Sequence, residues 1–117
     1  MRRGEIWWVN LGAHRPCEQT GRRPVVIWQS DALTRVLQSV LMVPLTTNTD
    51  RARLAGTAVI AALEDGPPQE SVALAFQMRA IPKTALSARI RPMTPAELTE
   101  LELASDEALG RIEPEST

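Results

Sequence analysis

Residues 17–28 read CEQTGRRPVVIW, and this stretch is the most informative in the chain. A carboxylate, an amide and two guanidiniums lie within seven residues, and Pro24 then leads into an apolar run typical of a buried strand. A polar loop with a strand on each side can hold a charged ligand in place. Arginine suits phosphate because its planar fork donates two parallel hydrogen bonds and stays protonated.

The polar loop covers residues 12–23. Around it the sequence predicts six short strands rich in Val, Ile, Trp and small residues. They cover residues 5–11, 24–29, 36–45, 57–63, 71–81 and 86–90. A single helical turn at 30–33 joins the second strand to the third, and polar loops at 46–56 and 64–68 separate the later strands. We expect Trp28 and Phe76 in the core. Trp7 and Trp8 are adjacent, so one should be buried and the other should lie at an interface or stack on a base.

The end of the chain changes character. Thr94-Pro95-Ala96-Glu97 matches a capping box with proline at the first helical position. Apolar residues then recur at helical spacing to Ile112, which predicts an amphipathic helix over about 94–112 whose acidic residues, Glu97 included, form a solvated face. Strands within 3–92 followed by this helix indicate one mainly β (α+β) domain over 1–117, a bent sheet or barrel with a helix laid against it.

Composition limits the possible functions. The net charge is only −1, but residues 1–60 hold eight arginines and four acids, whereas residues 61–117 hold five basic and ten acidic residues. Twelve of the thirteen basic residues are arginine, which favours phosphate recognition or reflects GC-rich coding. No long apolar run or signal peptide is present, and the single cysteine fits a cytoplasmic protein with no membrane association.

Several kinds of chemistry are excluded. One histidine and one cysteine cannot supply a common zinc site, so no metal is predicted. The carboxylates cluster in the terminal helix rather than around a metal-dependent phosphoryl-transfer site. No glycine-rich phosphate loop or dinucleotide fingerprint occurs, so no cofactor is expected.

The polar groups at strand ends suit a reaction that needs only positioning and charge stabilisation. RNA transesterification is such a reaction because the 2′-OH of the substrate is the nucleophile. Arg23 can bind the non-bridging oxygens and Thr46 can donate a hydrogen bond to the same group, while Glu18 either acts as base or holds Arg23. The candidates for binding RNA are His14, Gln19, Arg22, Thr47, Asn48, Gln77 and Arg79.

Four motifs in order make this interpretation specific: RGEIW at 3–7, EQxGxRP at 18–24, VPLTT at 43–47 and QxRxI at 77–81. Together they resemble the MazF/PemK family of toxin endoribonucleases from type II toxin–antitoxin systems. The resemblance extends over residues 3–92, and the terminal helix fits the family plan more loosely.

The resemblance implies an SH3-like antiparallel barrel of five to seven strands that forms a homodimer, with single-stranded RNA along the dimer interface. It implies metal-independent cutting of mRNA at a preferred sequence, leaving a 2′,3′-cyclic phosphate and a 5′-OH, and a small acidic antitoxin as partner. Arg23 and Thr46 take the catalytic roles, and Glu18 and Gln19 shape the loop. Some relatives have a histidine at the position of Cys17 and an acid at that of Phe76, so their proton-transfer roles do not carry over. His14 is the one imidazole that could substitute.

Alternatives remain open. Arg23 could be a loop staple paired with Glu18, and Gln77 and Arg79, which share a face of the strand predicted for 71–81, could read bases, bind phosphate or only solvate that face. The whole chain could also be a non-catalytic toxin that binds a protein, or a nucleic-acid-binding SH3-like module. Cleavage of RNA in chelator separates the enzyme from both.

Overall fold

The computed structural model describes residues 1–10, 22–62 and 66–113. Its strands are β1 (Glu5–Asn10), β2 (Arg22–Ile27), β3 (Ser39–Thr46), β4 (Thr57–Ile60), β5 (Ser71–Leu74), β6 (Arg79–Pro82) and β7 (Leu86–Pro92). Its α-helices are α1 (Asp31–Val36) and α2 (Pro95–Ala108), and its 3₁₀ helices are η1 (Thr49–Arg53), η2 (Ala75–Gln77) and η3 (Lys83–Ala85).

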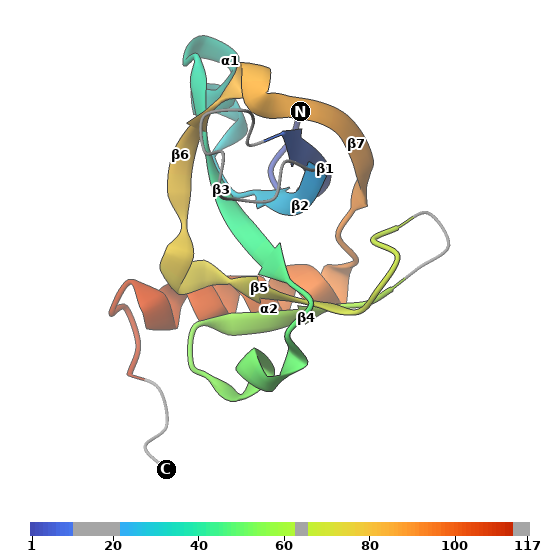
Figure 1. Cartoon of the computed structure of the whole chain (residues 1–117). Helices are drawn as coiled ribbons and strands as arrows, with labels where there is room; N and C mark the ends of the chain where they lie inside the picture. The colour runs from blue at the N-terminus through green and yellow to red at the C-terminus, as the bar shows by residue number, and fades with distance from the viewer. Residues whose placement is uncertain (11–21, 63–65, 114–117) are drawn as a thin grey trace, which may run out of the picture.

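The strands form one antiparallel sheet in the order β4-β5-β3-β2-β1-β7, and β6 pairs with β3 alongside. The sheet curls strongly on itself, and α2 lies across its base against β4 and η2 (Figure 1). Within the described residues β4 and β7 form no ladder with each other, so the barrel stays open. This confirms the predicted mainly β (α+β) class, an antiparallel barrel-like sheet followed by a C-terminal helix.

The central strand β3 buries both of its faces, which gives the molecule two apolar cores. Val43 and Leu45 face a cluster that includes Trp28 and reaches Leu101 and Ala104 of α2. The alternate residues of β3 face a second cluster, which consists of Val9, Val25, Ile27, Val40, Met42 and Ile81. Each fully buried side chain of this kind contributes about 1.5–3 kcal/mol, so the two clusters fix the register of β3.

The C-terminal helix begins as predicted and ends earlier. The Thr94 hydroxyl and the Glu97 carboxylate form a reciprocal capping box. The helix ends at Ala108 rather than near 112, because Gly110 adopts a positive φ of 75° that turns the chain. Leu109 is therefore 65% exposed, as a residue beyond the helix. Glu97 is buried, so its predicted place on a solvated face is wrong.

The predicted strand over 71–81 is in fact two strands separated by η2. The Ala75 N–H donates to the Gly56 carbonyl at 2.9 Å, and the Met78 N–H donates back to the Ala75 carbonyl at 3.1 Å. This 3₁₀ turn breaks the alternation, so the expectation that Gln77 and Arg79 share a face of one strand is wrong. Phe76 lies in the turn and is 45% exposed, which corrects its predicted place in the core.

The three tryptophans take different positions. Trp28 is buried as predicted, and its Nε1–H donates to Ser105 Oγ at 2.7 Å. Trp7 and Trp8 are both half-buried, so neither is the fully buried partner expected of the pair. Trp7 packs against the second cluster and donates from Nε1 to Glu5 at 3.1 Å.

No helix in the described ranges is long and apolar enough to cross a membrane.

Candidate functional site

Arg23 and Thr46 lie on neighbouring strands and on the same side of the sheet. The register of β2 with β3 pairs Val25 with Pro44 and Ile27 with Met42. Continued by two residues, the same register brings Arg23 opposite Thr46. Residues two or four apart on a strand point to the same face of the sheet. Arg23 therefore shares the face of Val25, and Thr46 shares the face of Met42, which is the face of the second cluster. The sheet therefore brings these two predicted residues together at one of its ends.

Arg23 is exposed and Thr46 is half-buried, so both side chains are accessible where the strands leave the core. Thr46 Oγ1 accepts a hydrogen bond from the Asn48 N–H at 3.2 Å. Asn48 Oδ1 in turn accepts the Asp50 N–H at 3.2 Å, at the start of η1. These bonds order the chain after β3. Because the Thr46 hydroxyl accepts in this arrangement, its own hydrogen can point toward an anion.

Arg22 lies opposite Asn10 at the loop end of the β1–β2 hairpin, on the other face from Arg23. Its guanidinium carbon lies 4.8 Å from the centroid of the Trp8 ring. Such a cation–π contact holds the guanidinium over the indole. Sequence reasoning identified both residues and missed their contact, because only the pairing of β1 with β2 brings them together.

Thr47 and Asn48 follow the end of β3, whereas Gln77 and Arg79 lie beside earlier residues of that strand. All four are exposed. Gln77 lies in η2, and Arg79 begins β6 opposite Met42 of β3. The structure thus brings Arg22, Arg23, Thr46, Thr47, Asn48, Gln77 and Arg79 to segments adjoining β2 and β3. Four other residues singled out from the sequence lie outside the described residues: His14, Cys17, Glu18 and Gln19.

Two carboxylates with altered pKa values stabilise the fold. Burial by itself raises the pKa of Glu97, but hydrogen bonds from Arg91 and from the Thr94 and Ala61 N–H groups outweigh it and lower the pKa. Glu5 follows the same pattern, with burial opposed by bonds from Trp7, Arg2 and Arg89. In the described ranges no three His, Cys, Asp or Glu residues group together as metal ligands would.

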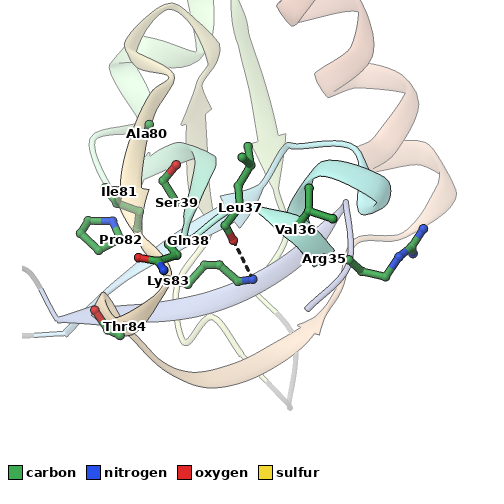
Figure 2. A pocket seen from close by; sticks show the side chains of 10 residues that line it. All are labelled: Arg35, Val36, Leu37, Gln38, Ser39, Ala80, Ile81, Pro82, Lys83 and Thr84. Carbon is green, nitrogen blue, oxygen red and sulfur yellow. Dashed lines mark hydrogen bonds between the residues drawn. The ribbon is translucent and has the colours of Figure 1, made fainter.

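A groove of about 740 Å³ lies away from Thr46, at the opposite end of β3 (Figure 2). It runs between the end of α1, with Val36 and Leu37, and the segment of β6 and η3 that holds Pro82 and Lys83. Lys83 Nζ donates to the Leu37 carbonyl at 3.0 Å, which ties the two walls together. Ser39 is the residue of β3 at this groove, about 23 Å along the strand from Thr46. The groove contains none of the predicted site residues.

Comparison with known proteins gives a consistent result. Residues 2–109 match the family described as PemK-like, MazF-like toxin of type II toxin-antitoxin system. Endoribonuclease MazF9 of Mycobacterium tuberculosis is 34% identical over 114 residues, which cover 93% of this chain and 92% of the relative. Endoribonuclease MazF of Staphylococcus saprophyticus is 28% identical over 110 residues, 94% of this chain and 92% of the relative. Endoribonuclease PemK of Escherichia coli is 46% identical over a shorter stretch of 59 residues, which covers 50% of this chain and 44% of the relative.

Among solved structures, an endoribonuclease in complex with its cognate antitoxin, from a mycobacterial species, superposes with a TM-score of 0.76. It is 25% identical, and the match covers 97% of this chain and 99% of the other. The toxin MazF-mt6 of Mycobacterium tuberculosis has the same fold at a TM-score of 0.70, with 21% identity and coverage of 91% and 96%.

The fold and the family match therefore define a small, mainly β toxin. The chain belongs to the PemK-like, MazF-like toxins of type II toxin–antitoxin systems.

Proposed function

We propose that the chain is an endoribonuclease that cuts single-stranded RNA, mRNA included, without a metal ion. The 2′-oxygen attacks the adjacent phosphorus and loses its proton, a pentacoordinate phosphorane forms, and the 5′-oxygen leaves and takes up a proton. The products are a 2′,3′-cyclic phosphate and a 5′-OH. The reaction needs no outside nucleophile, so the protein has only to orient the RNA and stabilise charge.

The observation that carries this proposal is the shared face and register of Arg23 and Thr46. A guanidinium and a hydroxyl on adjacent strands can both donate to the non-bridging oxygens of one phosphate. The negative charge on those oxygens grows as the phosphorane forms, so donors that are already in place stabilise the transition state more than the substrate. Relatives that match nearly the whole length of this chain are named endoribonucleases, which supports the same reaction.

The proton transfers are assigned to the loop at residues 12–23. Glu18 is the proposed base, or else the carboxylate that orients Arg23, and His14 is the imidazole available as acid or base near neutral pH. Gln19, Arg22, Thr47, Asn48, Gln77 and Arg79 are the proposed contacts to the RNA backbone and bases.

The proposed partners follow from the family. One solved structure with a similar fold is that of an endoribonuclease in complex with its cognate antitoxin, which supports a protein antitoxin for this chain. We expect that antitoxin to be small and acidic, with a tail that folds over the RNA site on binding. We also expect a homodimer in the cytoplasm, where cutting mRNA would stop translation and growth.

A long synthetic RNA incubated with the protein in EDTA tests the proposal. Sequencing of the fragments and analysis of their ends should reveal recurring cut sites with cyclic phosphate and 5′-OH termini. Intact RNA under conditions where the protein binds it would favour the alternative, a non-catalytic toxin or an RNA-binding module.

A further inference from the structure

The groove between α1 and η3 is a preformed concave surface that the proposed reaction does not use. Its volume of about 740 Å³ is within the usual range of ligand-binding clefts. Lys83 Nζ donates to the Thr34 carbonyl at 2.5 Å and to the Leu37 carbonyl at 3.0 Å. The Lys83 N–H donates to the Gln38 carbonyl at 2.9 Å. Because these bonds join the two walls, a partner meets the groove already in place.

The walls of the groove carry apolar side chains that are open to solvent. Val36 is 75% exposed and Leu37 is 41% exposed at the end of α1, and Pro82 is exposed on the opposite wall (Figure 2). Single exposed apolar residues are common on protein surfaces. Here several lie together along one concave surface, so one partner can bury them all at once.

The charged lining of the groove is entirely basic. It consists of Arg35 and Lys83, and no carboxylate belongs to the lining. The Lys83 ammonium donates to backbone carbonyls, whereas Arg35 extends from the rim and, within the described ranges, forms no ion pair. A guanidinium pairs with a carboxylate through two parallel hydrogen bonds. The groove is therefore complementary to acidic side chains and repels basic ones.

The lining favours a peptide over RNA. Proteins bind single-stranded RNA with aromatic rings that stack on the bases, together with a cationic groove. No aromatic residue lines this groove, and its one residue of β3, Ser39, is about 23 Å along the strand from Thr46. A segment bound here would leave the candidate site open to RNA.

We propose that this groove binds a short acidic segment of a partner protein. Its carboxylates pair with Arg35 and face Lys83, and its apolar side chains cover Val36, Leu37 and Pro82. We assign the segment to the antitoxin, which is expected to be acidic. The identity of the partner thus rests on the proposed function, whereas the groove as a binding site does not depend on RNA cleavage.

NMR on the isotope-labelled full chain tests this inference. The probes are two short synthetic peptides with the same Leu and Ile residues, one with Glu and the other with Lys at its polar positions. The Glu peptide should shift the amide signals of Val36, Leu37 and Thr84 and leave those of Thr46 and Asn48 unchanged. The Lys peptide should shift neither set, because the basic lining repels it.

Variants of the groove then separate its two kinds of contact. Val36→Asp should weaken binding of the Glu peptide about tenfold or more, because it places a carboxylate against carboxylates. Val36→Ile should bind as the wild type does. Arg35→Glu should weaken binding and remove most of its dependence on salt, as the loss of a rim charge does.

The matched control is Arg111→Glu, the same charge reversal at an exposed arginine after α2, and it should have no effect. All of these variants should cut RNA at the wild-type rate. Thermal unfolding checks that each is folded.

The proposal would be overturned by a Glu peptide that does not bind, by equal binding of the Lys peptide, or by unchanged affinity in Val36→Asp. Shifts at Thr46 and Asn48 instead of the groove would also overturn it. Self-association of the wild type that Val36→Asp abolishes would assign the groove to a second copy of the chain and overturn the acidic partner. Peptide binding in the groove without any cleavage of RNA would contradict the proposed function and leave the binding site standing.

Discussion

Arg91 of β7 and Glu97 of α2 form a two-pronged ion pair in the interior, with Nη1 2.9 Å from Oε1 and Nη2 3.0 Å from Oε2. Arg91 is 3% exposed. Its remaining N–H groups donate to the carbonyls of Gly66, Pro92 and Ala61. All five guanidinium hydrogens are thus used, and the pair ties the start of α2 to β7 and to the chain after β4.

The first prediction concerns this pair. Glu97→Gln should lower the free energy of unfolding by about 3–5 kcal/mol, because it leaves the buried guanidinium without its counter-charge. Urea unfolding measures this change. A matched control is the exposed pair Arg111–Asp106, with side chains 71% and 41% exposed. Arg111→Gln should cost less than about 1 kcal/mol. Equal effects of the two variants would contradict the role given to Arg91 and Glu97.

The second prediction concerns pH. The pKa of Glu97 in the folded state lies below its ordinary value of 4.5, because hydrogen bonds to the carboxylate outweigh burial. The unfolded chain therefore takes up this proton at higher pH than the folded protein does. The resulting stability is fully present above the unfolded pKa and is lost as pH falls through the folded one. Between pH 6 and pH 3 the free energy of unfolding should fall less steeply in Glu97→Gln than in the wild type. Identical slopes would mean that Glu97 is not linked to acid unfolding.

The third prediction concerns Arg23. Arg23→Ala should lower the rate of RNA cleavage by at least about 10²–10³, as does loss of a donor aimed at the transition state. Its unfolding free energy should change little, since Arg23 is exposed at the start of β2. Arg35→Ala is the matched control, an exposed arginine of α1 beside the remote groove. It should cut at the wild-type rate, and turnover retained in Arg23→Ala would remove this residue from the reaction.

The fourth prediction concerns Cys17, which lies outside the described residues. The proposed reaction uses the substrate 2′-OH as nucleophile, so a thiol has no covalent step to perform. Cys17→Ser should leave the cleavage rate within about twofold of the wild type, because a hydroxyl replaces the thiol at nearly the same size. Comparison of single-turnover rates tests this, and a drop comparable to that of Arg23→Ala would show that Cys17 takes part.

Local patterns predicted most of the fold. Apolar runs located β1, β2, β3, β4 and β7, and Thr94 with Glu97 marked the start of α2. Two of the boundaries that differ from the prediction depend on the backbone. Small residues from Ser71 onward suit strand or 3₁₀ turn alike, and only the bond from Ala75 to Gly56 selects the turn. Apolar spacing continued to Ile112, but Gly110 ends α2 before it.

The sequence indicated which residues belong to the candidate site, but it indicated less about how they are arranged. The motifs identified Arg23 and Thr46, and strand pairing then put them on one face. Contacts between distant segments had no local signal. Arg91 and Glu97 are six residues apart, but their buried pair is completed by Ala61 after β4, whose carbonyl accepts from Arg91 and whose N–H donates to Glu97. Phe76 is exposed because η2 interrupts the strand that was predicted there.

The central claim is that the RNA itself supplies the nucleophile at the phosphate held by Arg23 and Thr46. Its most direct test uses two otherwise identical RNAs, one of which has a single 2′-deoxy residue on the 5′ side of a mapped cut. Both are incubated with the wild-type protein in EDTA. The account predicts that the all-ribose strand is cut to a cyclic phosphate end and that the substituted site stays intact. Cleavage at the 2′-deoxy site at an unchanged rate would contradict it.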